Sequence, residues 1–216
     1  MVADALVYHP AVSHYLRYVA TTIGRDKVLR TIQYFSRFYA WYLYRTNNPE
    51  RLIQPWATLK VQFALVRKVL RAGKFVEHVR AGSELYDAAS KTRSGDQITA
   101  YLQILRQVGY AGYLFFDMLT LPDALGVKKY TSAKRLQATA YRMWLLGLAA
   151  SASAGVYTHY KLQARLKGIS VKDPEGRVER LNVAKQQKAT NMQLVSDLCD
   201  LTVPVHSLDT LPSTMA

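Results

Sequence analysis

The segment between Leu59 and Arg80 constrains the fold more than any other part of this 216-residue chain. Placed on a helix at about 100° per residue, its side chains separate into a cationic arc and an aliphatic arc. The cationic arc holds Lys60, Arg67, Lys68, Arg71, Lys74 and His78. The aliphatic arc holds Val61, Phe63, Leu65, Val66, Val69, Leu70, Val76 and Val79. The spacing therefore predicts one amphipathic helix over Leu59–Arg80.

This predicted helix is typical of one that lies in a membrane interface. Solvated helix faces usually mix acids and bases, whereas the cationic arc holds five Lys/Arg and no acid. Each cation near an anionic leaflet contributes about 1 kcal/mol, so five would contribute about 5 kcal/mol. We predict a membrane-binding basic face of Lys60, Arg67, Lys68, Arg71 and Lys74, and a membrane-inserting apolar face of Phe63, Leu65, Val66, Val69 and Leu70. A core-facing helix with an exposed basic side is the alternative.

The rest of the chain has helical punctuation and no strand alternation or hairpin dipeptide. Half of the residues are hydrophobic, which excludes disorder of the whole chain. We expect an all-α, membrane-associated helical bundle with an interfacial amphipathic helix and one or two candidate membrane-embedded helices. The expected boundary signals are a stop at 47–49, a start at Pro55, an end at 82–83, a start at 94–96, a stop at 121–126 and a helix from 131–132 to Gly168.

These signals divide the chain into four predicted regions. Residues 1–95 form an N-terminal amphipathic helical region, and residues 96–168 form a membrane-associated helical hairpin. A polar loop and a C-terminal helix, expected from Arg177 toward Asp200, occupy residues 169–204. Residues 205–216 form a short polar tail.

The stretch Met143–Tyr160 carries no Asp, Glu, Lys or Arg, and it reaches the lower length limit of a membrane-spanning helix. Its centre is built from small residues, and Gly147, Ser151 and Gly155 recur at four-residue spacing. Such spacing permits close packing against another helix. Val108–Leu121 could pair with this stretch as a hairpin. A buried helix of a soluble bundle is the alternative for Met143–Tyr160.

Seven of the 24 aromatic residues fall between Tyr34 and Tyr44. Tyr and Trp accumulate where hydrocarbon meets water, because their rings are apolar and carry one polar group. A packed aromatic core would have the same composition. The sequence leaves these two interpretations of the cluster open.

The sequence offers no catalytic or metal-binding pattern. Its five histidines are dispersed, Cys199 is the single cysteine, and no glycine-rich phosphate loop follows a strand. Asp197 and Asp200 beside Cys199 are interpreted as a polar helix face. We therefore expect a protein that is not an enzyme and that uses no metal or cofactor. The net charge of +14 favours an anionic partner, such as a phospholipid membrane, an acidic protein or a nucleic acid.

Several stretches resemble the fungal peroxin-eleven proteins, which are peroxisomal membrane elongation and proliferation factors. The resemblance covers residues 1 to about 204 and is carried by Leu6-Val7-Tyr8-His9-Pro10, Gly24-Arg25-Asp26-Lys27-Val28-Leu29-Arg30, Gln33-Tyr34, the 63–75 block and Asp197 to Pro204. It implies a self-associating protein of the peroxisomal membrane that inserts an amphipathic helix and elongates the organelle before dynamin-type fission. The family's membrane-bending helix falls on Leu59–Arg80.

The end of the sequence departs from this family pattern, because His206–Ala216 is short and polar where relatives continue with a Gly-rich apolar segment. We expect a truncated or variant C-terminus and internal targeting signals, since the chain does not end in Ser-Lys-Leu. We predict peroxisomal membrane remodelling, with anionic phospholipid and further copies of the chain as partners. A membrane pore or metabolite conduit is the second hypothesis. A soluble basic nucleic-acid binder is a third, disfavoured because no groove-reading Asn or Gln accompanies the basic arc.

Overall fold

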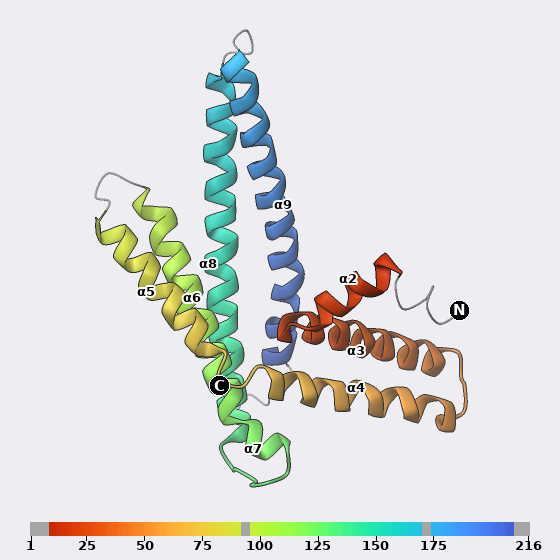
Figure 1. Cartoon of the computed structure of the whole chain (residues 1–216). Coiled ribbons are helices and arrows are strands. Elements are labelled where there is room, and N and C mark those ends of the chain that lie inside the picture. The colour runs from red at the N-terminus through yellow and green to blue at the C-terminus, as the bar shows by residue number, and fades with distance from the viewer. Residues whose placement is uncertain (1–8, 92–95, 170–173, 210–216) are drawn as a thin grey trace. The chain divides into compact units, whose positions relative to one another are not determined.

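A computed structural model describes residues 9–91, 96–169 and 174–209 (Figure 1). Within these ranges the chain forms helices and no strand, which confirms the predicted all-α class. The residues group into two compact units. One extends to Ala72 and includes Ala124–Val127, and the other comprises Gly73–Asp123 and the chain from Lys128 onward.

The first unit is built from α2 (Pro10–Val19), α3 (Thr22–Arg45) and α4 (Glu50–Leu70). The α3 and α4 helices lie side by side as an antiparallel hairpin (Figure 1). At the corner between α2 and α3, the Thr21 hydroxyl accepts a hydrogen bond from the Gly24 amide at 3.0 Å. A Cβ at Gly24 would lie 1.8 Å from the Tyr18 carbonyl oxygen, so this tight corner requires glycine.

The α3–α4 turn follows the predicted stop at 47–49. Asn47 has φ of 52°, a left-handed conformation that Asn tolerates, and Pro49 caps α4 with extended backbone. The predicted start at Pro55 is wrong, because α4 begins at Glu50 and Pro55 lies inside it. Pro49 already supplies the extended residue before the helix, and Pro55 costs α4 one backbone hydrogen bond.

The predicted continuous helix over Leu59–Arg80 is also wrong. Helix α4 ends at Leu70, and α5 (Phe75–Lys91) begins after a turn. Gly73 in this turn has φ of +77°, the conformation that terminates helices and that glycine adopts without strain. The 100° periodicity therefore does not carry across Gly73, where one of the divisions between the two compact units falls.

The second unit is built from α5, α6 (Gln97–Leu119), α8 (Ala133–Gly168) and α9 (Pro174–Asp209), with the short α7 (Leu121–Ala124) between α6 and α8. Helix α6 packs on α5 and on α8, and α8 pairs along its length with α9 (Figure 1). Asp96 caps α6, as the start signal at 94–96 predicts, and α8 confirms the helix predicted from 131–132 to Gly168.

Two helix ends in this unit differ from the sequence expectation. Helix α5 continues through Gly82 and Ser83, where the sequence predicted its end. A Cβ at Gly82 would only reach van der Waals contact, 3.4 Å from Gln107 Cβ, so the packing here does not require glycine. Helix α9 is longer than predicted and runs through Pro204 to Asp209. Pro204 is buried, and this packing outweighs the one hydrogen bond that proline cannot make. Residues 205–209 of the predicted tail are thus helical, and residues 210–216 lie outside the described ranges.

Small residues bring the helices of this unit into close contact. Gly109 of α6 faces Gly147 of α8, and a Cβ at Gly109 would lie 2.5 Å from the Gly147 backbone. Gly155 faces Leu194 of α9, and a Cβ there would lie 2.6 Å from the leucine side chain. The three predicted packing positions therefore contact two different helices, since Gly147 meets α6 while Ser151 and Gly155 meet α9.

A buried carboxylate fixes the alignment of α8 and α9. The Ser151 hydroxyl donates to Asp197 Oδ2 at 2.6 Å, and the Gln193 amide donates to Oδ1 at 2.8 Å. Asp197 is 1% exposed, so these two hydrogen bonds are what compensate its removal from water. The sequence interpretation of Asp197 as part of a polar helix face is wrong, because it points into the α8–α9 contact.

In the helices that the structure describes, none combines the length and the apolar character that a membrane crossing requires.

Candidate functional site

The contact between α3 and α4 is organised around Arg67. Its Nε donates to Asp26 Oδ1 at 2.9 Å, and its Nη1 donates to Gln33 Oε1 at 2.6 Å. The side chains of Arg67 and Asp26 are only 11% and 19% exposed. The prediction that Arg67 lies on a solvated basic face is therefore wrong. It ties α4 to α3 instead, because α3 supplies the acid and the amide that satisfy it.

A second contact in this hairpin is aromatic and is centred on Trp56 of α4. The Trp56 ring meets Tyr39 edge-on, with centroids 4.8 Å apart, and meets Phe35 edge-on at 5.8 Å. Phe35 and Tyr39 are themselves stacked along α3 at 5.9 Å. Edge-to-face pairs at these separations are favourable aromatic contacts. Part of the aromatic cluster thus packs between the two helices.

Helix α4 carries a continuous apolar stripe on the side where Trp56 lies. Its members recur at alternating steps of four and three residues, which places them on one face of a helix. They are Leu52, Trp56, Leu59, Phe63, Val66 and Leu70. Leu52 and Val66 are 48% and 43% exposed, although both are apolar. The stripe therefore presents hydrocarbon outward as well as packing against α3.

The predicted apolar face maps onto this stripe only in part. Phe63, Val66 and Leu70 belong to it, whereas Leu65 and Val69 project from the other side of α4. Val66 and Val69 are exposed, and Phe63, Leu65 and Leu70 are half-buried.

The predicted basic face is divided by the helix break. Lys60, Lys68 and Arg71 are half-buried residues of the first unit, and Arg67 is held by α3 as described above. Lys74 lies beyond the break, in the second unit. The sequence could not reveal this division, because Gly73 was one glycine inside an otherwise regular pattern.

Most of the positive charge of the chain nevertheless lies in the first unit. Residues 9–72 contain eleven Lys/Arg and two acids, Asp26 and Glu50, and so carry nine of the fourteen net positive charges. Asp26 is bound to Arg67. A small helical unit with this charge and exposed apolar side chains has the composition of a surface that binds anionic interfaces.

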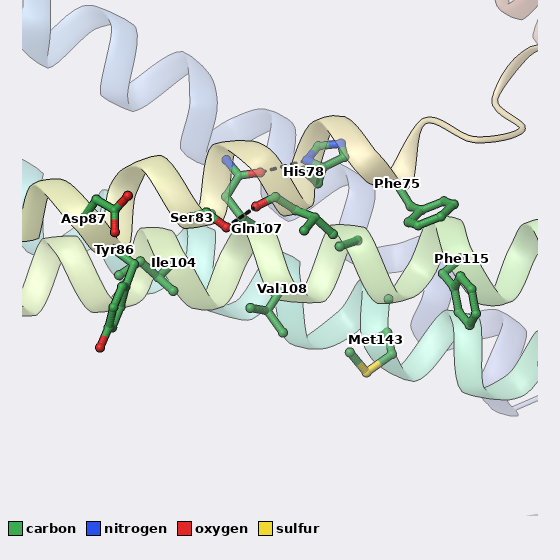
Figure 2. Close-up of a pocket in the computed structure, with 14 residues that line it drawn as sticks. Phe75, His78, Ser83, Tyr86, Asp87, Ile104, Gln107, Val108, Phe115 and Met143 are labelled. Carbon is green, nitrogen blue, oxygen red and sulfur yellow. Dashed lines mark hydrogen bonds between the residues drawn. The ribbon is translucent and has the colours of Figure 1, made fainter.

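The second unit contains an apolar groove between α5 and α6, with Met143 of α8 at one side (Figure 2). Its volume is about 690 Å³, within the range of small-molecule sites. Polar contacts are few: His78 Nδ1 lies 2.7 Å from Gln107 Oε1, and the His78 ring stacks on Tyr110 at 5.5 Å. Burial raises the pKa of the Tyr110 phenol, behind His78, above its ordinary value.

The described residues bring together no set of three or more His, Cys, Asp or Glu that could hold a metal ion. Cys199 is exposed on α9. The polar side chains that line the groove are His78, Ser83, Tyr86, Asp87 and Gln107. The rest of its lining is apolar, as Phe75, Ile104, Val108, Phe115 and Met143 in Figure 2 illustrate.

Comparison with known proteins gives a consistent result. The family model for peroxisomal biogenesis factor 11 (PEX11) matches residues 12–215. Peroxisomal membrane protein PMP27 of Saccharomyces cerevisiae is 33% identical over 68% of this chain and 59% of its own length. Peroxisomal membrane protein PMP30A of Candida boidinii is 32% identical over 70% of this chain and 59% of its own length. The chain therefore spans less than two thirds of these relatives.

A more distant relative is covered more completely. Peroxisomal biogenesis factor 11 of Schizosaccharomyces pombe is 20% identical over 94% of this chain and 86% of its own length. No solved structure matches the chain.

Proposed function

The chain belongs to the peroxisomal biogenesis factor 11 family and is a peroxisomal membrane protein, and on that premise we propose that it remodels the peroxisomal membrane by inserting an apolar helix face into one leaflet. The observation that carries this proposal is the apolar stripe of α4, with Leu52 and Val66 exposed in a unit of strongly positive charge. Shallow insertion expands one leaflet relative to the other and curves the membrane.

The energetics support reversible adsorption. Each Lys or Arg near an anionic leaflet contributes about 1 kcal/mol, and burial of each exposed Leu or Val adds about 1.5–3 kcal/mol at most. The basic side chains predicted from the sequence, other than Arg67, remain the proposed lipid contacts. Clustering of copies of the chain would multiply local curvature, and dynamin-type fission machinery would act on the elongated membrane.

This proposal is tested with the full chain and anionic vesicles, by sedimentation and by electron microscopy of tubules. The test variant is Leu52→Glu with Val66→Glu, at two exposed positions of the stripe. The matched control is Thr58→Glu with Val61→Glu, at two exposed positions on the other side of the same helix. Each variant adds two negative charges and so loses about the same electrostatic attraction to anionic lipid. The difference in vesicle affinity between the two variants therefore measures apolar insertion.

We expect the control to bind vesicles about 30-fold more weakly, from about 2 kcal/mol of lost attraction. The stripe variant should bind at least about tenfold more weakly still and form no tubules, because its carboxylates must stay hydrated. Equal binding by the two variants would contradict the insertion mechanism. Absence of vesicle binding by the unaltered chain would contradict the proposal as a whole.

A further inference from the structure

We propose that the membrane-inserting surface is two helices wide, because α3 adds an aromatic row beside the apolar stripe of α4. This inference rests on the proposed function and assigns to the first unit a second lipid contact. The occupant to which we commit is an anionic phospholipid interface. The aromatic row consists of Phe35, Phe38 and Tyr42.

The aromatic row lies on one face of α3, since its members are three and seven residues apart. Phe35 meets Trp56 at 5.8 Å, and Trp56 belongs to the apolar stripe. Tyr39, on the α4-facing edge of the row, contacts both Trp56 and Tyr42. These contacts place the aromatic row and the apolar stripe on the same side of the hairpin.

The aromatic row is exposed even though it is apolar. Phe35 and Phe38 are 54% and 58% exposed, and Tyr42 is exposed as well. Helix α2 packs on the start of α3 at Gly24 and leaves these three rings uncovered. A contiguous exposed apolar surface over two helices is rare in monomeric soluble proteins and indicates an interaction site.

A different face of α3, called the polar side here, carries charged and amide groups. Asp26, Gln33 and Arg37 recur along α3 at steps of seven and four, and Arg67 of α4 binds the first two. The charged groups on the polar side of α3 thus point away from the aromatic row of the same helix. Arg67 stabilises this arrangement by fixing the register of α3 against α4.

Charge decides between a lipid and a protein as the occupant. Residues 9–72 carry eleven Lys/Arg against two acids, so this unit is strongly positive. A leaflet rich in anionic lipid is attracted by the whole unit. Tyr rings suit the depth at which acyl chains meet headgroups, because the phenol oxygen stays hydrated while the ring is buried.

The test compares full-length chains with equal numbers of exposed aromatic residues removed from α3. The test variant is Phe38→Ser with Tyr42→Ser, which alters the aromatic row. The matched control is Tyr34→Ser with Tyr44→Ser, at two exposed positions of the same helix that lie outside the row. Circular dichroism establishes that each variant is folded, and vesicle sedimentation at fixed ionic strength gives the affinity.

We expect the row variant to lose at least about tenfold in affinity for anionic vesicles and the control to change less than about threefold. A loss of equal size in both, or no loss in the row variant, would overturn the inference. The variant with Leu52→Glu and Val66→Glu reports on α4 alone. If that variant binds vesicles more weakly while the row variant is unaffected, the two-helix surface is refuted and the proposed function stands. If neither the α4 variant nor the row variant loses affinity for vesicles, both the inference and the proposed function are refuted.

A second readout does not depend on affinity. A chain with Trp41→Phe and Trp144→Phe keeps Trp56 as its one tryptophan. Lipids brominated on the acyl chains should quench Trp56 fluorescence strongly, since Trp56 is the stripe residue that contacts the row. Fluorescence that is unaffected by brominated lipid, with the chain bound to the vesicles, would overturn the inference.

Discussion

Arg67 gives the sharpest test of how the hairpin is held together. The sequence pattern assigns it to a lipid-facing basic surface, whereas the structure places it against Asp26 and Gln33 of α3. Arg67→Met keeps most of the aliphatic stem and removes both hydrogen bonds. If Arg67 faces lipid, this change weakens vesicle binding. If Arg67 binds α3, the change destabilises the α3–α4 hairpin.

The magnitude follows from the burial of the pair. Hydrogen bonds to charged groups contribute about 1.5–3 kcal/mol, and breaking a fully buried ion pair costs about 3–5 kcal/mol. Asp26 keeps 19% of its side-chain surface and remains partly hydrated when Arg67 is lost. We therefore expect the hairpin to lose about 2–3 kcal/mol, which corresponds to about 30- to 150-fold faster hydrogen exchange when exchange reports the opening equilibrium.

Hydrogen exchange of the full chain, followed by mass spectrometry, measures this loss locally. Peptides from α3 and α4 should lose protection in Arg67→Met, while α8 and α9 keep theirs. Arg51→Met is the control, because Arg51 is an exposed residue of the same helix. Unchanged protection in Arg67→Met, together with weaker vesicle binding than in Arg51→Met, would show that Arg67 contacts lipid and would refute the reasoning.

Three further predictions concern the rest of the chain. Gly73→Ala should lower the free energy of unfolding by about 1 kcal/mol in urea titrations, because φ is +77°, while Gly168→Ala should not. Gly109→Ala should lower the melting temperature more than Gly155→Ala, since its Cβ would meet the Gly147 backbone rather than a movable leucine. Lys161 holds the pKa of Asp96 down to about 2, so the stability that Asp96 adds relative to Asp96→Asn should be complete above about pH 4 and disappear as pH falls toward 2.

The sequence predicted helices and their caps well where a local signal sets them. Asp96 and the 131–132 signal mark real helix starts, and the turn at 47–49 is real, because each depends on residues next to one another. Glycine was harder to interpret. Gly82 lies inside α5, whereas Gly73 adopts φ of +77° and ends the regular pattern, and nothing beside either glycine in the sequence distinguishes the two cases.

The sequence could predict which residue types make up the candidate site, but not how those residues are arranged in space. The aromatic cluster and the basic residues are visible in the sequence, but a helical wheel cannot show which arc meets a neighbouring helix. Arg67 turned inward because Asp26 and Gln33 lie opposite it, more than thirty residues away in the chain. The aromatic row of α3 was likewise hidden, since its position beside the stripe depends on the contact between Phe35 and Trp56.

The depth of the α3–α4 hairpin in the bilayer tests the central claim most directly. In chains with Cys199→Ser, a spin label is attached at Val66→Cys on the stripe, at Arg37→Cys on the polar side, or at Tyr160→Cys of α8 as an exposed control. Electron paramagnetic resonance of chains bound to anionic vesicles compares collisions with oxygen, which enriches in hydrocarbon, and with a water-soluble nickel chelate. We predict that the label at 66 collides mainly with oxygen and that the labels at 37 and 160 collide mainly with nickel. A bound chain whose label at 66 is as accessible to nickel as the label at 37 would contradict the insertion of this face.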